Sequence, residues 1–453
     1  MATTAALLTN KGHTVSGSDK NVFPPMSDFL AAEGIPILKG FHEDRITDEL
    51  DLVVVGNVVS RGNPEIEAVL ERRIRCCSLP EIVRDEFLWE KKPIVLAGTH
   101  GKTTTTAMAG WLLVHAGLDP TVLVGGIVKD FGADGSSYRV GEGQDFVIEG
   151  DEYDTAFFDK SPKFLKYIPD VVVINNIEFD HADIYQGLDD VQLAYKRLVN
   201  LVPKNGLLLL GADNNHTLAL RDLSSSPAST FGFSDGADWQ AYNIALINGR
   251  TRFSVRQRGV EFGEFELQLP GAHNVSNALG AIAVGAHRGL SSGALAEGLK
   301  AFQGIKRRLE VLGIVDGVTV FDDFAHHPTA VRETLSALRL SNPSSRLWAV
   351  FEPRSASSCR KVFQTDFVDA FSPADEVILA SVFRSDLPHE EQLSIEVLAR
   401  ELSQRGQRAR AIPDVDDIVM TIVNEHKDGD LVVLMSNGEF GGIHQKLLKA
   451  LSL

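Results

Sequence analysis

The sequence has few cysteines, fewer basic than acidic residues, and no long apolar run. Three cysteines, Cys76, Cys77 and Cys359, occur among 453 residues. They cannot form a disulfide framework and lack the spacing of a metal site, so we expect reduced thiols in the cytoplasm. Lys and Arg number 44 against 61 Asp and Glu, and the net charge of −17 argues against extended nucleic-acid binding. No apolar run reaches about 18 residues, the length that a membrane span needs.

What is present is enough length and apolar content for more than one domain. With 453 residues, 44% of them hydrophobic, the chain can fill two or three packed cores. Short helical and β-type runs alternate throughout and divide into three blocks, residues 1–91, 92–304 and 305–453. In the middle block, alternation over 251–271 predicts a β-hairpin, and the serine-rich stretch 223–230 predicts a loop. The predicted fold class is α/β, in which ligands bind where the strands end.

The stretch GTHGKTTTT (98–106) follows an apolar strand and has the features of a phosphate-binding loop. Gly98 and Gly101 allow a tight turn with inward amides, and Lys102 supplies a positive charge. The hydroxyl of Thr103 stands where nucleotide sites place a Ser or Thr that binds Mg²⁺. A helix over 103–116 would direct its N-terminal dipole toward an anion. Together these features predict nucleotide binding.

Two further predicted strands are followed by oxygen-rich segments, EGDEYD (149–154) and NNIEFDHADIY (175–185). If these strands neighbour the strand before the phosphate loop, their ends converge on that loop. Mg²⁺ prefers oxygen ligands and keeps several waters, so one or two protein ligands suffice. Glu149 and His181 are the leading candidates, although acidic residues at strand ends are also common as solvated groups.

Six motifs carry a resemblance to a known family: GTHGKTTTT, VIEGDEYD, NNIEFDHADIY, GAHNVSNALGAIA, GIKRRLE and DDFAHHPTA. In this order they resemble the Mur ligases, the ATP-dependent amide ligases of peptidoglycan synthesis, over essentially the whole chain. The resemblance implies a Rossmann-like N-terminal domain for a UDP-sugar, a central P-loop ATPase-like domain, and a Rossmann-like C-terminal domain for the incoming amine. It also implies ATP as co-substrate, Mg²⁺ as cofactor, and a carboxylate activated as an acyl phosphate.

The resemblance assigns roles to residues of the matching motifs. Lys102 and Thr103 would hold the terminal phosphates and Mg²⁺, with Glu149 and His181 as further Mg²⁺ ligands. The implied nucleotide site comprises Gly98, Thr99, His100, Gly101, Lys102, Thr103, Thr104, His273, Asn274, Asn277, Arg308 and Asp323. Of these, the residues of HNVSN would lie near adenine and Arg308 near the phosphates. Asp323 and His326 would reach the nucleotide when the third domain closes, and the base for the amine is His326 or His327.

Lys196 is a further candidate because some Mur ligases use a carbamylated lysine on the helix after the D-H motif to bridge metals. Lys196 lies 15 residues after His181, which suits that role. The members most similar to this sequence often lack this lysine, and a surface lysine on an amphipathic helix is the equal alternative.

The acceptor amine depends on the C-terminal third. The resemblance implies UDP-N-acetylmuramate as the sugar substrate. It leaves two acceptors, the murein tripeptide L-Ala-γ-D-Glu-meso-diaminopimelate of peptidoglycan recycling and the L-alanine of de novo synthesis. VFEPRSAS and MSNGEFGGIH favour the tripeptide, whose carboxylates need a wider, more cationic pocket. Arg354, Asn437 and Gly438 are the expected peptide contacts, although Arg354 could instead pair with Glu352. A P-loop kinase with another acceptor, or an inactive UDP-sugar-binding protein, remains a rival.

The chain opens with MATTAALLTN, which predicts the tail of a helix. The family's first domain opens instead with a strand and a glycine-rich turn that touches uridine diphosphate. We therefore expect part of the UDP-sugar site to be missing, with Ser18, Asp19, Asn57 and Arg61 as the remainder. Binding of the UDP-sugar should be weaker than in a chain longer by about 20 residues, one strand plus its turn. The sequence predicts no oligomeric state.

Overall fold

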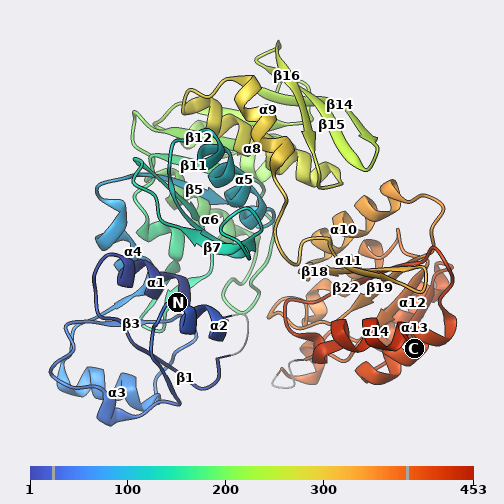
Figure 1. Ribbon diagram of the computed structural model, residues 1–453, viewed down its shortest axis with the longest axis horizontal. Helices are drawn as coiled ribbons and strands as arrows, with labels where there is room; N and C mark the ends of the chain where they lie inside the picture. The colour runs from blue at the N-terminus through green and yellow to red at the C-terminus, as the bar shows by residue number, and fades with distance from the viewer. Residues whose placement is uncertain (23–25, 384–386) are drawn as a thin grey trace.

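The computed structural model describes residues 1–22, 26–383 and 387–453 and folds into three regions (Figure 1). The N-terminal region lies at the lower left of the figure, the central region above it, and the C-terminal region at the right. Each region has its own sheet or sheets, as the predicted α/β class requires. None of the described helices combines the length and the apolar character needed to cross a bilayer.

Short parallel strands build the N-terminal region. They are β1 (Gly17–Asp19), β2 (Ile37–Lys39), β3 (Val53–Val55) and β4 (Cys76–Ser78). β1 pairs with β2, and β3 with β4, so the described residues form two two-stranded sheets rather than one continuous sheet. The helices are α1 (Ala2–Asn10), α2 (Met26–Ala32), α3 (Pro64–Arg72) and α4 (Leu79–Val83). α1 confirms the helical prediction for the first residues, and α3 begins where the side chain of Asn63 caps its free N–H groups.

A ten-stranded sheet forms the central region, with β5 (Lys92–Ala97) between β11 (Val171–Ile174) and β8 (Asp145–Glu149). Alternate residues of β5 face opposite sides of the sheet. Ile94 and Leu96 pack with α5 (Lys102–His115) and α8 (Ala272–His287), whereas Val95 and Ala97 pack on the side of α6 (Leu188–Val199). Both faces are therefore buried, which explains the continuous apolar runs of these strands. The sheet also contains β6 (Thr121–Val128), β7 (Ser136–Arg139), β12 (Leu207–Gly211) and β13 (Ala228–Gly232).

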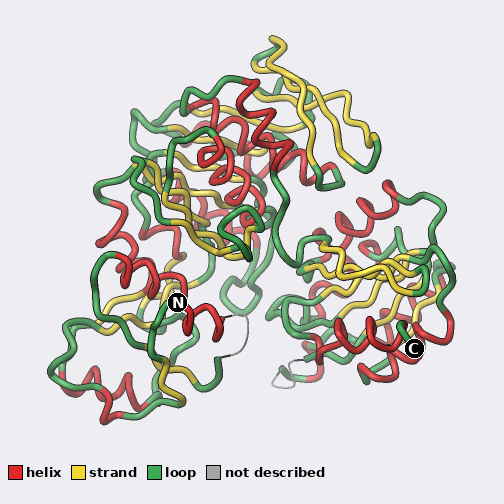
Figure 2. The backbone as a smooth tube through the Cα atoms, viewed as in Figure 1, coloured by secondary structure: helices red, strands yellow, loops and turns green. Residues whose placement is uncertain are grey.

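The predicted hairpin is confirmed as an antiparallel extension at one edge of this sheet, seen at the top of Figure 2. It consists of β14 (Trp239–Ile247), β15 (Arg250–Gln257) and β16 (Val260–Leu267), and β15 pairs with β16. α9 (Ser292–Ala301) follows α8. The loop predicted over 223–230 is wrong at its end, because residues 228–230 already belong to β13 and pair with β12. Smaller elements are β9 (Asp154–Ala156), β10 (Asp159–Pro162) and α7 (Asn215–Leu218).

A six-stranded sheet of order β17-β18-β22-β19-β20-β21 forms the C-terminal region. Its strands are β17 (Glu310–Val315), β18 (Val318–Asp323), β19 (Leu347–Phe351), β20 (Glu376–Leu379), β21 (Arg408–Ala411) and β22 (Leu431–Met435). All pairs are parallel except β17 with β18. One face packs with α10 (Pro328–Ser341), α11 (Gln364–Ala370) and α12 (Ile395–Gln404), and the other with α13 (Val415–Glu425) and α14 (Ile443–Leu451).

Candidate active site

The loop between β5 and α5 has the backbone of an anion cradle. Gly98 and Gly101 have φ values of +131° and +80°, a region that L side chains rarely adopt. A Cβ atom at Gly101 would lie 2.2 Å from Oδ1 of Asn277, so this position also has no room for a side chain. The N–H groups of the first turn of α5, including those of Lys102 and Thr104, have no helical carbonyl partner. They can therefore bind phosphate oxygens, as the sequence predicted.

The strand arrangement brings the two oxygen-rich segments to this loop. β8 and β11 flank β5 in parallel, so their carboxyl ends lie at the same edge, which confirms the predicted neighbours. Thr103 donates its hydroxyl proton to Oε1 of Glu149 (2.8 Å), and the N–H of Gly125 donates to Oε2 (2.7 Å). Burial, followed by the nearby charge of Asp151, raises the pKa of Glu149.

Lys102 and His181 meet at a carboxylate that the sequence did not single out. Glu152 is 2% exposed and accepts from Nζ of Lys102 (3.0 Å) and from Nε2 of His181 (3.0 Å). Burial alone would lower the pKa of His181, but the hydrogen bond and charge of Glu152 raise it to about 9. Burial would likewise lower the pKa of Lys102, and Glu152 again raises it. Glu152 therefore holds both side chains at the phosphate loop.

Thr103 and Glu149 offer oxygen ligands that suit the Mg²⁺ of nucleotide sites. The hydroxyl of Thr103 and the carboxylate of Glu149 are hard oxygen ligands, and they already lie within hydrogen-bonding distance of each other. A divalent ion between them would stabilise the charge of a carboxylate whose burial disfavours ionisation. His181 has a φ of 52°, a strained value for a residue other than glycine, and such strain is commonest at functional sites.

Three asparagines support the phosphate loop. Asn175 donates to the hydroxyl of Thr105 (2.8 Å), and Thr105 donates to Oδ1 of Asn277 (3.2 Å). Asn176 accepts from the N–H of His100 (2.7 Å). Asn277, predicted to lie near adenine, thus sits beneath the phosphate loop and braces it.

The other residues of HNVSN lie at the start of α8. Asn274 is buried, and its side chain donates to the carbonyl of Pro270 (2.7 Å). Nδ1 of His273 is buried and has no hydrogen-bond partner among the described residues, and it lies 3.7 Å from the carboxylate of Glu333 on α10. A ring nitrogen without a hydrogen-bond partner at this position is compatible with the predicted contact to adenine.

Of the two adjacent histidines of the C-terminal region, His326 is the one with a nitrogen left to act as a base. Its Nδ1 must donate to the carbonyl of Phe324 (3.0 Å), so Nε2 keeps its lone pair. In His327, Nε2 donates to the carbonyl of Phe179 (3.1 Å) and Nδ1 accepts from the N–H of Thr329 (3.3 Å). Burial lowers the pKa of His326, which keeps the ring neutral. The structure therefore favours His326 over His327.

Two residues that were predicted to reach the nucleotide, Asp323 and Arg308, lie in the C-terminal region. The buried carboxylate of Asp323 accepts from the backbone N–H groups of Leu309 (2.7 Å) and Ala325 (2.8 Å). These bonds fix the turn after β18, and a contact of Asp323 with the nucleotide on closure of the third domain stays a prediction. Arg308 lies over the ring of Phe324 (5.2 Å to the centroid) and remains available to an anion at this strand end.

Of the two alternatives for Lys196, the geometry favours the surface lysine. Lys196 is exposed on α6, whereas its neighbour Tyr195 is fully buried, and the tyrosine hydroxyl lies beside the loop at Gly98 and Thr99. Adjacent helical residues point about 100° apart, so the face directed at the loop belongs to Tyr195. This geometry favours a surface role for Lys196 over a role as a metal ligand.

The predicted peptide contacts gather where β19 and β22 end. The guanidinium of Arg354 lies 3.6 Å from the carboxylate of Glu352, so the alternative of an internal ion pair is present. Arg354 also packs against Gly438, where a Cβ atom would lie 2.1 Å from its Nε. Oδ1 of Asn437 is buried without a hydrogen-bond partner among the described residues, as expected for a group that meets a ligand.

The predicted UDP-sugar residues lie at the strand ends of the N-terminal region. Ser18 and Asp19 end β1, and Asn57 follows β3. Arg61 is exposed and forms a two-pronged ion pair with Glu67 (3.0 and 2.9 Å). No contact among the described residues brings Arg61 to the phosphate loop.

The C-terminal region meets the phosphate loop at Glu178. Oε2 of Glu178 accepts from Nε2 of His100 on the loop (3.1 Å) and from the hydroxyl of Thr329 at the start of α10 (2.6 Å). Burial would raise the pKa of Glu178, but the hydrogen bond from His100 lowers it to about 2. His100, Glu178 and His327 place potential metal ligands within 4.8 Å of one another, yet protein groups already bond them. We therefore interpret the cluster as an interdomain contact.

Family models and individual relatives both match this chain along almost its whole length. Family models described as "Mur ligase family, catalytic domain", "Mur ligase middle domain" and "Mur ligase, glutamate ligase domain" match residues 1–86, 96–285 and 307–438. A UDP-N-acetylmuramate–L-alanyl-γ-D-glutamyl-meso-2,6-diaminoheptandioate ligase of Escherichia coli is 39% identical over 99% of this chain and 95% of its own length. A UDP-N-acetylmuramate–L-alanine ligase of Clostridium novyi is 33% identical over 99% and 95%.

Solved structures with a similar fold include the same two kinds of ligase. A murein peptide ligase of Psychrobacter arcticus has a TM-score of 0.75 and 34% identity, covering 100% of this chain and 96% of that one. A UDP-N-acetylmuramate–alanine ligase of Thermotoga maritima has a TM-score of 0.80 and 25% identity, covering 98% and 95%. The chain belongs to the Mur ligase family, whose members are ATP-dependent enzymes that form amide bonds.

Proposed function

We propose that the protein joins UDP-N-acetylmuramate to the murein tripeptide L-Ala-γ-D-Glu-meso-diaminopimelate, with ATP cleaved to ADP and phosphate. The observation that carries the chemistry is the convergence of Lys102, Thr103, Glu149 and His181 on one loop. The higher identity to the tripeptide ligase, 39% against 33%, supports the choice of acceptor. Residues 1–91 would hold the UDP-sugar, 92–304 ATP, and 305–453 the peptide.

The first half-reaction activates the sugar carboxylate. A carboxylate oxygen attacks the γ-phosphorus of ATP, the bond from that phosphorus to the bridging oxygen breaks, and ADP leaves. Lys102 is charged and lies at the cradle, where it offsets the negative charge that builds up on the phosphate. Bound Mg²⁺, held by Thr103 and Glu149, would supply further charge neutralisation. Glu152 holds Lys102 and His181 in position.

The second half-reaction forms the amide. The peptide amine attacks the carbonyl carbon of the acyl phosphate, the carbon–oxygen bond to phosphate breaks, and the nitrogen loses a proton. Nε2 of His326 carries a free lone pair and is our candidate for that proton's acceptor. The acyl phosphate must be kept from water, which the contact between the C-terminal region and the phosphate loop at Glu178 can achieve.

The test is ADP release in the presence of UDP-N-acetylmuramate and either the tripeptide or free L-alanine. Turnover that depends on the tripeptide, with little from alanine, is expected. Turnover with alanine alone would assign the protein to de novo synthesis, the second candidate, which the 33% identity to an alanine ligase keeps in view. Lys102→Met provides the control, since it retains the length of the side chain but removes its charge.

A further inference from the structure

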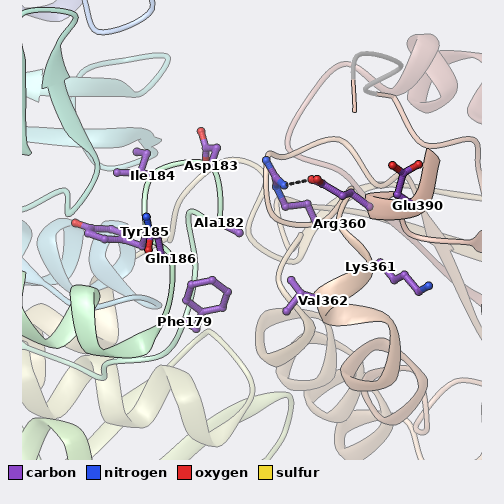
Figure 3. Close-up of a pocket in the computed structure, with 11 residues that line it drawn as sticks. Phe179, Ala182, Asp183, Ile184, Tyr185, Gln186, Arg360, Lys361, Val362 and Glu390 are labelled. Carbon is purple, nitrogen blue, oxygen red and sulfur yellow. Dashed lines mark hydrogen bonds and ion pairs between the residues drawn. The ribbon is translucent and has the colours of Figure 1, made fainter. Parts of the chain in front are cut away.

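A pocket of about 680 Å³ lies between the central and C-terminal regions (Figure 3). One wall is the segment after β11, residues 179 and 182–186. The opposite wall is formed by residues 360–362 and 390–391 of the C-terminal region. The volume falls in the range of small-molecule sites, about 300–1,000 Å³.

The pocket adjoins the proposed reaction centre through the chain itself. Ala182 lines it and directly follows His181, whose ring is hydrogen-bonded to Glu152. The N–H of Ala182 donates to the hydroxyl of Ser357 (3.3 Å), which ties the two walls together beside the opening. A molecule that reacts near the phosphate loop and extends beyond His181 would therefore enter this space.

The walls carry charges of both signs. Arg360 and Lys361 line the pocket from one segment, and Glu390 and Glu391 from another. In Figure 3 the guanidinium of Arg360 reaches toward the central segment, whereas the ammonium of Lys361 points away from it, so Lys361 would have to turn to meet a ligand. Arg360 is held in place by its ion pair with Glu391 (2.9 Å). Its Nε–H is buried and has no hydrogen-bond acceptor among the described residues. The ion pair thus fixes the orientation of the guanidinium of Arg360, and its Nε–H is left to donate to a ligand.

We propose that this pocket selects the distal end of the acceptor peptide, with Arg360 and Lys361 binding its terminal carboxylate and Glu390 its free ammonium. This inference rests on the proposed function. A diaminopimelate residue at the third position ends in one carboxylate and one ammonium, the pair of charges that the walls complement. Three extended residues span about 10 Å, enough to lead from a reacting amine past His181. Free L-alanine has no such end, so an alanine ligase would have no use for these charges.

The experiment compares three acceptors in wild type and in Arg360→Leu, Lys361→Met and the double variant. The acceptors are the tripeptide, the same peptide with lysine in third place, and the dipeptide L-Ala-γ-D-Glu. We expect the KM for the tripeptide to rise about 10- to 100-fold in the double variant, as for a lost charge-assisted contact. The KM for the lysine peptide, which lacks the distal carboxylate, and for the dipeptide should stay within twofold, as should the KM values for ATP and UDP-N-acetylmuramate.

Controls separate charge at the pocket from general effects. Arg360→Lys keeps the charge and should retain most of the tripeptide affinity. Arg405→Leu removes an equal charge at an exposed ion pair with Asp369 and should change no KM. Lys361 is exposed, so Lys361→Met gives a reading even if Arg360→Leu does not fold.

The outcomes distinguish this inference from the proposed function. If wild type turns over the tripeptide but the variants bind all three acceptors as wild type does, the pocket assignment is wrong. An equal rise in KM for the dipeptide and the tripeptide would also overturn it. Free L-alanine is offered to wild type in parallel, and if wild type turns over alanine and none of the three peptides, the proposed function itself fails.

Discussion

Removal of one interdomain hydrogen bond should weaken the docking of the C-terminal region on the phosphate loop. Thr329→Val deletes the hydroxyl that donates to Oε2 of Glu178 at 2.6 Å and keeps the shape of the side chain. A hydrogen bond to a charged group contributes about 1.5–3 kcal/mol. Because Glu178 is 32% exposed, solvent screens it, and we use the lower end, about 1.5 kcal/mol.

That free energy corresponds to about a tenfold shift from docked toward undocked regions. We expect kcat/KM for the acceptor to fall about tenfold, and the radius of gyration from X-ray scattering to increase. The affinity for ATP alone should change little, because His100 keeps its own hydrogen bond to Glu178.

Thr421→Val is the matched control, since among the described residues its hydroxyl donates only to the carbonyl of Asp417 within α13. Thr329→Ser should behave as wild type. If Thr329→Val retains wild-type scattering and kcat/KM, the contact at Glu178 does not hold the regions together.

Three further substitutions test separate parts of the structure. Gly101→Ala should abolish nucleotide binding in calorimetry, because its Cβ would lie 2.2 Å from Oδ1 of Asn277 at a φ of +80°; measurable affinity would contradict the cradle. Lys196→Ala and removal of CO₂ should leave the rate of ADP release unchanged, whereas a loss of rate in both would restore the carbamate hypothesis. Asp316→Asn should lower the free energy of unfolding in urea by about 0.2–1 kcal/mol at pH 6. Burial lowers the pKa of His426, but the hydrogen bond that its Nε2 donates to the carboxylate of Asp316 raises it, and the net shift is upward. The stabilisation from the His426–Asp316 pair is complete below the pKa of the histidine in the unfolded chain and is lost as pH rises through its pKa in the folded protein. The difference in unfolding free energy between wild type and Asp316→Asn should therefore shrink at pH 9.5.

The sequence was sufficient to predict features that depend on residues close together in the chain. The phosphate loop, the helix after it and the hairpin at 251–271 follow from glycine positions and periodicity, and the structure has all three. The convergence of the segments after β8 and β11 on the loop needed only their adjacency to β5.

The sequence was insufficient where the orientation of a helix, or a contact between regions, determines which side chain reaches the site. Lys196 and Tyr195 are adjacent, and only the packing of α6 shows which of them faces the loop. Among the acids of EGDEYD, no pattern marks Glu152 as the one that meets Lys102. The contact between Glu178 and Thr329 joins residues 151 positions apart, which no local pattern can reveal.

The proposed reaction can be tested directly with UDP-N-acetylmuramate labelled with ¹⁸O in its lactyl carboxylate. An acyl phosphate transfers one of the two carboxylate oxygens to phosphate, so we expect one ¹⁸O per phosphate released, with the tripeptide as acceptor. Mass spectrometry of the phosphate and of the amide product gives both readings in one reaction. Unlabelled phosphate, or labelled phosphate that forms with alanine and not with the tripeptide, would contradict the proposed ligation.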